Sequence, residues 1–316
     1  MANYLVTGGA GFIGSQLTKK LIAQGHDVLV VDDLSNGKII HPQATYIKKD
    51  ITQLDNIHGL FKTIHGCFHL AAIPVVSMDF DQWFLFHKIN LDGSLNVFKS
   101  AVDAGNVPVV YASSCGVYGE SKRMPLTESQ RINPLSAYGC DKLSTELNAG
   151  FLSHIYKLPS TGLRLFNVYG PYQQATSPYS GVIAKFITRI LNNKPLTIFG
   201  DGEQVRDFVF VEDVVDNLIH AMNTVKSAAQ CVNICTGVSI TINKLANLIS
   251  SLLEKECVIN YKPARQYDVN VSYGSRKKMN ACGFRADHDI KQGLIKTIDY
   301  FKLDSAVINE LGCRRP

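Results

Sequence analysis

Residues 4–14 read Tyr-Leu-Val-Thr-Gly-Gly-Ala-Gly-Phe-Ile-Gly, and this stretch decides the fold. Its first three residues are apolar and predict a buried strand that ends at the glycine cluster. Apolar residues then recur four positions apart at Ile13, Leu17 and Leu21, the spacing of one helix face, and Gly25 is suited to end the helix. A glycine turn between strand and helix lets backbone N–H groups approach a pyrophosphate. The stretch therefore predicts a dinucleotide-binding turn, and its glycines fit two versions of the pattern: Gly9, Gly11 and Gly14, or Gly8, Gly11 and Gly14.

An acidic pair follows the next apolar run. Residues 28–31 predict a second strand, and Asp32 and Asp33 come directly after it. A carboxylate at this place suits the adenosine ribose hydroxyls of NAD and would repel the extra phosphate of NADP. The same residues belong to Asp-Asp-Leu-Ser-Asn-Gly, a run of turn formers, and the two roles are compatible.

Further apolar segments alternate with helical ones. Helices are predicted over 84–104 and 138–156, and a serine pair, Ser113 and Ser114, ends the strand between them. This alternation predicts an α/β protein with a doubly wound parallel sheet, in which ligands bind at the carboxyl ends of the strands. The remaining strands are predicted at 45–48, 67–70, 107–113, 162–166 and 231–234, and further helices at 182–191, 242–253 and 289–301.

A tyrosine and a lysine four residues apart form the catalytic candidate. The chain contains three such pairs, Tyr118/Lys122, Tyr138/Lys142 and Tyr273/Lys277, and only the second begins a segment with helical periodicity. On a helix the two side chains share a face, so the ammonium can lie near the phenol. A neighbouring cation favours the phenolate, and lowering the pKa of Tyr138 by three units would need about 4 kcal/mol. We therefore expect Lys142, together with the charge of oxidised nicotinamide, to lower the pKa of Tyr138.

With these motifs in place, the chain resembles the extended short-chain dehydrogenases/reductases, and is most similar to the UDP-sugar 4-epimerases. The resemblance extends over nearly the whole chain. Its motifs follow in the family's order: Thr7-Gly-Gly-Ala-Gly-Phe-Ile-Gly14, Asp32-Asp33-Leu34, Asp50-Ile51, His69-Leu-Ala-Ala72, Ser113-Ser-Cys-Gly-Val-Tyr-Gly119, Tyr138/Lys142, Arg164-Leu-Phe-Asn-Val-Tyr-Gly-Pro171, Phe199-Gly-Asp-Gly202, Arg206-Asp207 and Asn233-Ile-Cys-Thr-Gly237.

The resemblance implies a Rossmann-type NAD-binding domain over 1–169, completed by a strand near 231–234. It also implies a smaller, interleaved α/β domain over 170–316 that binds the nucleotide sugar. NAD is the expected cofactor, and no metal site is predicted. The implied catalytic residues are Ser114, Tyr138 and Lys142, and the implied cofactor-binding residues are Gly8, Gly11, Phe12, Ile13, Gly14, Asp32, Asp33, Asp50, Ile51, Ala71, Ala72, Asn90, Tyr138 and Lys142.

Fewer residues carry over to the substrate side. By resemblance, Asn167 contacts the diphosphate, Arg206 and Arg265 grip it, and Phe199 lies beside the uracil, with Ser114 at the sugar. The seventh residue after Arg265 resembles a gate: tyrosine restricts the pocket, and a small residue admits an N-acetyl group. Here it is Ser272, so UDP-N-acetylglucosamine and UDP-N-acetylgalactosamine are expected substrates. The chain departs from the family pattern at 73–78, at Tyr267-Asp268 and at Gly274-Ser275.

The residues after Ser114 favour one reaction over its neighbours. By resemblance, the 4,6-dehydratases of this family have Asp-Glu at these two positions. The UDP-glucuronate decarboxylases have a Glu there. Cys115 and Gly116 supply no carboxylate, whereas an epimerase needs none. We therefore expect a UDP-hexose 4-epimerase. UDP-glucuronate 4-epimerase, decarboxylase or another nucleotide-sugar dehydratase remain alternatives, as does a regulator that binds NAD without chemistry.

The composition is that of an ordinary soluble protein. The 316 residues are 46% hydrophobic and 19% charged, the net charge is +5, and no basic run suggests a nucleic-acid partner. Eight scattered cysteines without Cys-x-x-Cys spacing suggest reduced thiols. The first strand leaves no room for a signal peptide and no apolar run reaches membrane-spanning length, so a cytoplasmic protein without a membrane partner is expected. The family resemblance implies a homodimer through the 84–104 and 138–156 helices.

Overall fold

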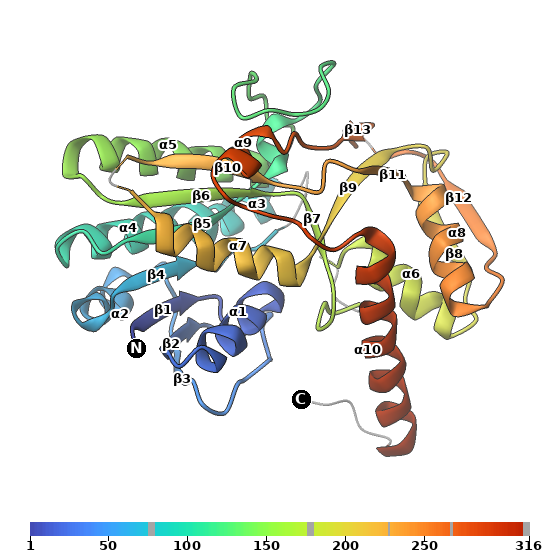
Figure 1. The fold of residues 1–316 in the computed structure, drawn as a ribbon, viewed down its shortest axis with the longest axis horizontal. Helices are drawn as coiled ribbons and strands as arrows, with labels where there is room; N and C mark the ends of the chain where they lie inside the picture. The colour runs from blue at the N-terminus through green and yellow to red at the C-terminus, as the bar shows by residue number, and fades with distance from the viewer. Residues whose placement is uncertain (75–79, 176–179, 227, 266–267, 312–316) are drawn as a thin grey trace.

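The computed structural model describes residues 1–74, 80–175, 180–226, 228–265 and 268–311. The chain forms two lobes (Figure 1). The larger lobe contains the N-terminus and a parallel sheet of seven strands in the order β10-β6-β5-β4-β1-β2-β3. Its strands, in chain order, are β1 (Asn3–Thr7), β2 (Asp27–Asp32), β3 (Thr45–Lys48), β4 (Gly66–His69), β5 (Val109–Ser114), β6 (Ser160–Leu165) and β10 (Gln230–Ile234). The predicted doubly wound sheet is confirmed.

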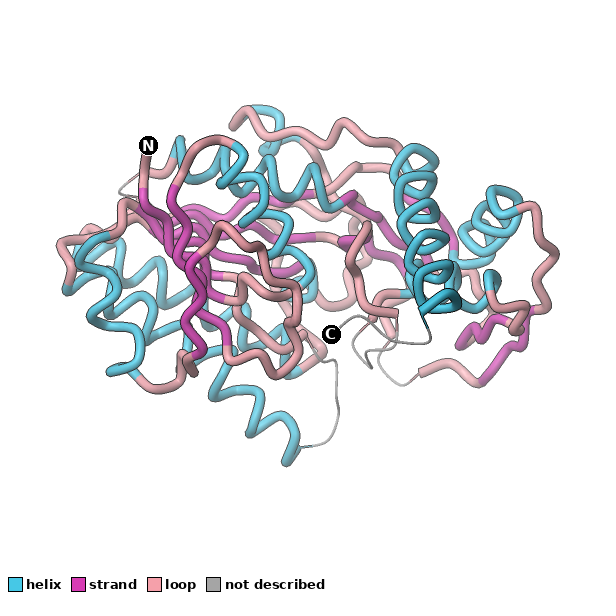
Figure 2. The backbone as a smooth tube through the Cα atoms, turned by 90° about the horizontal axis from the view of Figure 1, so that it is seen from below, coloured by secondary structure: helices cyan, strands magenta, loops and turns pink. Residues whose placement is uncertain are grey.

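Both faces of this sheet are covered, because its strands are apolar on both sides. Val6 packs in the core beneath α1 (Phe12–Ala23) and α7 (Val211–Thr224). Its neighbour Leu5 packs in a second core beneath α4 (Gly93–Asp103) and α5 (Ala137–Tyr156). Figure 2 shows the strands of the sheet running between the two helical layers. The second layer also contains α2 (Leu54–Ile57) and η1 (His58–Thr63).

Two helical segments differ from the sequence prediction. The stretch predicted over 84–104 is built from α3 (Phe80–His87), a π-helical turn η2 (Lys88–Asp92) and α4. Helix α7 was not predicted, although Val211, Val214 and Leu218 have helical spacing. It follows β9 (Val205–Phe210) without a polar break, so the change from strand to helix period is hidden within one apolar run.

The smaller lobe is formed mainly by the chain after residue 169. Two short sheets lie beside three helices, and the chain returns to the larger lobe to form α7 and β10. The predicted helices at 182–191 and 242–253 are confirmed as α6 (Val182–Leu191) and α8 (Ile242–Leu253), and the last helix, α10, spans Ile290–Leu311. The other elements are η3 (Cys115–Tyr118), β7 (Asn167–Tyr169), β8 (Leu196–Phe199), β11 (Ser239–Thr241), β12 (Ile259–Lys262), β13 (Val271–Ser272) and α9 (Lys277–Ala281).

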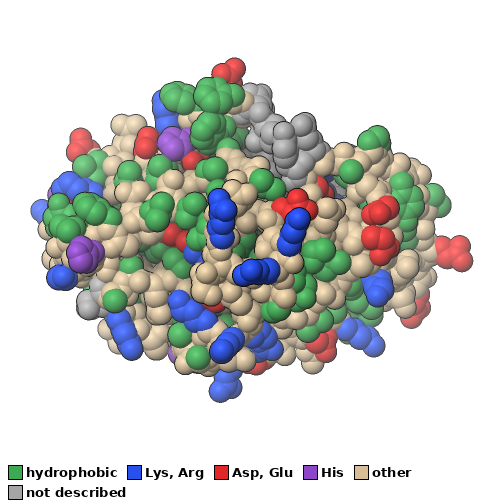
Figure 3. All heavy atoms as spheres, turned by 90° about the horizontal axis from the view of Figure 1, so that it is seen from above, with side chains coloured by type: hydrophobic (Ala, Val, Ile, Leu, Met, Phe, Trp, Pro, Cys, Tyr) green, Lys and Arg blue, Asp and Glu red, His purple; other side chains and the backbone are tan. Residues whose placement is uncertain are grey.

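Basic side chains on the face drawn in Figure 3 are interspersed with acidic and hydrophobic ones. None of the helices in the described part of the chain combines the length and apolarity needed to cross a membrane.

Candidate active site

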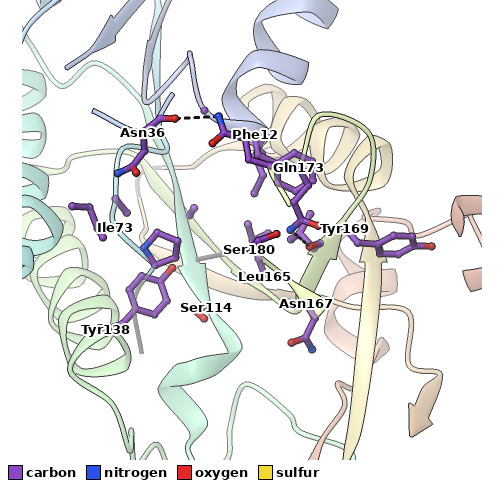
Figure 4. A pocket seen from close by; sticks show the side chains of 18 of the residues that line it. Phe12, Asn36, Ile73, Ser114, Tyr138, Leu165, Asn167, Tyr169, Gln173 and Ser180 are labelled. Atoms are coloured by element: carbon purple, nitrogen blue, oxygen red, sulfur yellow. Dashed lines mark hydrogen bonds between the residues drawn. The ribbon is translucent and has the colours of Figure 1, made fainter. Parts of the chain in front are cut away.

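One cavity of about 1060 Å³ lies between the two lobes. The carboxyl ends of β1, β2, β4 and β5 open into it from the larger lobe, and α6, β8 and β9 border it from the smaller one. Figure 4 shows Asn36 near one end, and Ser114, Tyr138 and Asn167 further along. A cavity of this extent can hold a dinucleotide and a second ligand side by side.

The glycine loop between β1 and α1 is shaped by backbone contacts. Gly8 has φ +71°, and a Cβ there would meet the Ala71 nitrogen at 2.6 Å. A Cβ at Gly14 would lie 2.2 Å from the Gly8 carbonyl oxygen, so helix and turn can approach this closely only without a side chain. Helix α1 begins after Gly11 without a side-chain cap, which leaves its first N–H groups for a ligand at the cavity.

Asp32 forms the turn that the sequence predicted and lies where it could contact a ligand, so its role at the NAD ribose stays a prediction. Its carboxylate accepts hydrogen bonds from the backbone N–H groups of Ala10, at 3.0 Å, and Leu34, at 2.9 Å, so it fixes the glycine loop and its own turn. It also lines the cavity. Burial raises the pKa of Asp32, and the two backbone hydrogen bonds oppose this effect. Asp33 closes the turn with the N–H and hydroxyl of Ser35.

The other predicted cofactor residues fall into two groups. All except Asn90 line the cavity. Asn90 lies in the π-helical turn, where its amide accepts from the Ile73 N–H at 2.8 Å and donates to the Ile73 carbonyl at 3.2 Å. Asn90 therefore supports the cavity wall from behind, and direct contact with NAD stays a prediction for it. The predicted cofactor residues that line the cavity are Gly8, Gly11, Phe12, Ile13, Gly14, Asp32, Asp33, Asp50, Ile51, Ala71, Ala72, Tyr138 and Lys142.

Ser114, Tyr138 and Lys142 all line the cavity, and Figure 4 shows Ser114 and Tyr138 close to each other. Strand β5 ends at Ser114, whose Oγ accepts a hydrogen bond from the Gly116 N–H at 3.0 Å. Ser136 caps α5 through the Gly139 N–H, so Tyr138 and Lys142 lie one turn apart at the start of the helix. The Lys142 ammonium lies 5.6 Å from the centre of the Tyr138 ring, and the Tyr138 hydroxyl hydrogen-bonds with Ser114.

In the protein without NAD the pKa of Tyr138 is raised, so its lowering by Lys142 together with oxidised nicotinamide stays a prediction. Burial raises the pKa of Tyr138 well above its usual value, with a smaller contribution from Cys115, and the Ser114 hydrogen bond opposes it. Burial also lowers the pKa of Lys142 to about 8, against the favourable charges of Asp141 and Glu146. Desolvation disfavours the charged form of both groups and outweighs the Ser114 hydrogen bond at Tyr138 and the acidic neighbours of Lys142.

A buried ion pair holds the catalytic helix against the sheet. Glu146, one turn after Lys142, accepts from Arg164 Nε at 2.9 Å and Nη2 at 2.7 Å, and from the Ser113 hydroxyl. Arg164 lies on β6, and its third nitrogen donates to the Tyr118 hydroxyl. Tyr118 belongs to the Tyr-x-x-x-Lys pair that the sequence set aside, and it is a buried structural residue. Glu146 was not predicted, although its place four residues after Lys142 puts it on the same helix face.

The predicted substrate residues lie at the other end of the cavity. The Arg265 guanidinium stacks on the Phe199 ring at 4.0 Å from the ring centre, and Arg206 pairs with Asp268 at 2.6 Å. Arg206 does not pair with the adjacent Asp207, whose carboxylate instead accepts backbone and hydroxyl hydrogen bonds, two of them from Thr236. Phe199, Arg206, Arg265 and Asn167 line the cavity. The two guanidinium groups suit a diphosphate.

Further side chains at this end were not predicted. Lys185 and Arg189 project from α6 into the cavity lining, and burial with the nearby charge of Arg265 lowers the pKa of Lys185.

Ser272, which the sequence predicted as a substrate residue, does not line the cavity. It is buried on β13, where it hydrogen-bonds with Cys115, so it borders the catalytic residues from behind.

Comparisons with known proteins agree with this arrangement. The chain matches the NAD dependent epimerase/dehydratase family over residues 4–235. It is 34% identical to a putative UDP-glucose 4-epimerase of Methanocaldococcus jannaschii, over 94% of this chain and 98% of that one. Among solved structures it resembles UDP-glucose 4-epimerase of Thermotoga maritima with UDP-glucose, with a TM-score of 0.90, 37% identity and coverage of 95% and 99%. It also resembles UDP-N-acetylglucosamine 4-epimerase of Methanobrevibacter ruminantium in complex with UDP-N-acetylmuramic acid, with a TM-score of 0.90, 35% identity and coverage of 96% and 98%.

The family match and the site fit the same cofactor. The uncapped start of α1, the side-chain-free approach at Gly14 and the Asp32 carboxylate together suit the pyrophosphate and the adenosine ribose of NAD. The chain therefore belongs to the NAD-dependent epimerase/dehydratase family, and NAD is its cofactor.

Proposed function

We propose that this protein catalyses the 4-epimerisation of a UDP-hexose, and that UDP-N-acetylglucosamine and UDP-N-acetylgalactosamine are among its substrates. The observation that carries the proposal is the position of Ser114, Tyr138 and Lys142 between the two ends of one cavity. One end is lined by the glycine loop and Asp32, and the other by the arginines. A nucleotide sugar whose diphosphate is held by Arg206 and Arg265 would present its hexose to the catalytic hydroxyls.

In the proposed reaction, Tyr138 accepts the proton of the sugar 4-hydroxyl while Ser114 hydrogen-bonds the same oxygen. Bound NAD supplies the hydride acceptor and, in the reverse step, the hydride donor. Lys142 holds positive charge beside Tyr138 and favours its deprotonated form. The 4-keto sugar then turns within the cavity, so that hydride returns to the opposite face of C4 and Tyr138 returns the proton. Oxidation and reduction cancel over the cycle.

The residues after Ser114 favour epimerisation over elimination or decarboxylation. Burial raises the pKa of the Cys115 thiol to about 11, so it stays protonated at neutral pH and is a poor base. Gly116 has no side chain. A dehydratase would need an acid–base pair near the sugar. A UDP-glucuronate decarboxylase would need a carboxylate in place of Gly116. The small residues leave room for the keto sugar to turn.

The choice of an N-acetylated sugar rests on Ser272. Its short side chain lies beside Cys115 next to the catalytic serine. A tyrosine at this position would have to direct its ring into buried space beside Cys115. By resemblance to the gate position, the short side chain leaves the adjoining wall of the cavity free of a bulky ring, which supports acceptance of a 2-acetamido group.

The test is a panel of UDP-glucose, UDP-N-acetylglucosamine and UDP-glucuronate, each incubated with purified protein without added NAD. Products are identified by NMR. We expect UDP-N-acetylglucosamine and UDP-N-acetylgalactosamine to interconvert. Activity on UDP-glucose alone would contradict the sugar assignment. Activity confined to UDP-glucuronate would make the protein a glucuronate epimerase, or a decarboxylase if carbon dioxide is released. Retained NAD with no turnover of any sugar would favour a regulator.

We also propose that the protein is a homodimer that pairs through α3 and α5. Three apolar side chains support this surface: Phe84 on α3 is 60% exposed, and Leu147 and Phe151 on α5 are 65% and 56% exposed. Apolar residues gathered on two adjacent helices are typical of a protein interface. Light scattering should give twice the chain mass, and Leu147→Glu with Phe151→Glu should give monomers. A monomeric wild-type protein would exclude this interface.

A further inference from the structure

The loop after β7, residues 170–175, is tied to the larger lobe by two glutamine side chains. Gln16, on α1, donates from Nε2 to the Pro171 carbonyl at 3.3 Å. Gln174 donates from Nε2 to the Asn36 carbonyl at 3.3 Å. Both bonds join the chain after β7 to segments that flank the glycine loop, more than a hundred residues earlier in the sequence.

The Asn36 anchor is fixed to the glycine loop. A Cβ at the adjacent Gly37 would lie 2.5 Å from the Ala10 carbonyl carbon, so the two backbones are in close contact. The Ile39 N–H also donates to the Ala10 carbonyl at 3.1 Å. The Asn36 carbonyl therefore cannot move far without displacing the glycine loop itself.

The loop at 170–175 is held on its other side by the smaller lobe. Tyr172 has φ +70°, and its ring stacks on Tyr300 of α10 with centroids 4.6 Å apart. The Gln173 amide donates to the Val168 carbonyl at 3.2 Å. Because these contacts do not depend on the glutamine bonds, the bonds to Gln16 and Gln174 can open while the loop keeps its shape.

The two sides face each other across the nucleotide end of the cavity. Asn36 and Gly37 line one side, Gln173 and Gln174 line the other, and Asp32 lies in the same lining. Figure 4 shows Asn36 and Gln173 on opposite sides of this end, with a dashed bond that reaches the Asn36 oxygen. In the proposed binding mode the adenosine half of NAD lies at Asp32, so the Gln174 bond closes over the part of the cavity through which it would leave. The Gln16 bond lies outside the cavity lining and holds the same loop to α1.

We propose that Gln16 and Gln174 form a glutamine clasp that slows the release of bound NAD. They are positioning residues, because they act on the loop and on the mouth of the cavity rather than on the reacting atoms. The proposal goes beyond the proposed function: it concerns the exit of the cofactor and does not depend on which sugar is turned over. Each hydrogen bond must break before the loop can separate from the larger lobe, and this adds to the barrier for release.

The experiment measures the rate at which NAD leaves the full-length protein. Protein loaded with NAD is mixed with a large excess of a dehydrogenase and its alcohol, which reduce any released NAD, and the appearance of NADH is followed. The variants are Gln16→Met and Gln174→Met, alone and together, since methionine keeps the side-chain length and removes the donor. The control is Gln53→Met, an exposed glutamine outside the cavity lining whose amide donates to Thr52.

Each single variant should release NAD about two- to tenfold faster, the effect of one ordinary hydrogen bond, and the double variant should approach the product of the two factors. Gln174→Lys keeps a donor and should restore slow release. The melting temperature of NAD-free protein should be unchanged in every variant. Wild-type release rates in the double variant would overturn the proposal. Equal acceleration in Gln53→Met, or faster release that only follows a lower melting temperature, would also overturn it. None of these outcomes depends on epimerase activity.

Discussion

Replacing Lys142 with methionine should make the NAD-free protein more stable and abolish its activity. Lys142 is 2% exposed, and burial lowers its pKa from 10.5 to about 8. A lysine whose pKa is lower in the folded than in the unfolded chain opposes folding while it is charged in both. That cost is fully present below about pH 8 and disappears as the pH rises toward 10.5, because the unfolded chain then binds more protons than the folded one.

The size of the effect follows from the shift. At about 1.4 kcal/mol per pKa unit, the charged lysine costs about 3 kcal/mol at pH 7. By pH 9.5 the folded protein holds the lysine neutral and the unfolded chain is still mostly protonated, so about 2 kcal/mol of that cost has been recovered. Lys142→Met removes the charge without removing the bulk. Its stability advantage over wild type should therefore fall from about 3 kcal/mol at pH 7 to about 1 kcal/mol at pH 9.5.

The assay is urea unfolding of both proteins after NAD has been stripped from them, at the two pH values. Subtracting the variant from the wild type removes the other groups that titrate in this range. A variant that is less stable than wild type at pH 7 would refute the reasoning, and so would an advantage that is the same at both pH values. Either result would mean that Lys142 is well solvated or fully compensated by Asp141 and Glu146.

Three further predictions address the site. Tyr138→Phe should lower turnover by roughly 10²- to 10⁴-fold while NAD remains bound, measured by product NMR and by NAD content; undiminished turnover would remove Tyr138 from the mechanism. Glu146→Gln should destabilise the protein by about 3–5 kcal/mol in urea unfolding, because it leaves the buried Arg164 guanidinium without its counter-charge, and a loss below 1 kcal/mol would contradict this. Ser272→Tyr should lose activity on UDP-N-acetylglucosamine while keeping activity on UDP-glucose, measured as two kcat/KM values, and equal losses on both sugars would contradict the gate.

Local patterns were enough to predict the parts of the fold that local physics determines. The glycines before α1, the acid after β2 and the periodicity of α6 and α8 each depend on residues close in sequence. Ser114, Tyr138 and Lys142 could be placed together because strands of a parallel sheet end at one edge.

What the sequence could not predict depends on contacts between distant segments. Nothing near Arg206 indicates that it pairs with Asp268, and nothing near Pro171 indicates that its carbonyl accepts from Gln16. The resemblance implies that Asn90 contacts NAD, and nothing near Asn90 in the sequence indicates that its amide hydrogen-bonds with Ile73. The degree of burial of Tyr138 could not be read from the sequence either. In the protein without NAD, burial raises the pKa of Tyr138 instead of lowering it.

That reversal has a consequence for how the site works. With Tyr138 buried and Lys142 only weakly basic, the protein alone favours a neutral phenol over a phenolate. The additional positive charge needed to favour the phenolate must therefore arrive with oxidised NAD, in the same cavity. In the proposed mechanism, proton acceptance by Tyr138 is then favoured by the presence of the oxidised cofactor. An enzyme that returns its hydride in every cycle gains from keeping the cofactor in place, and slow release preserves the base as well as the oxidant.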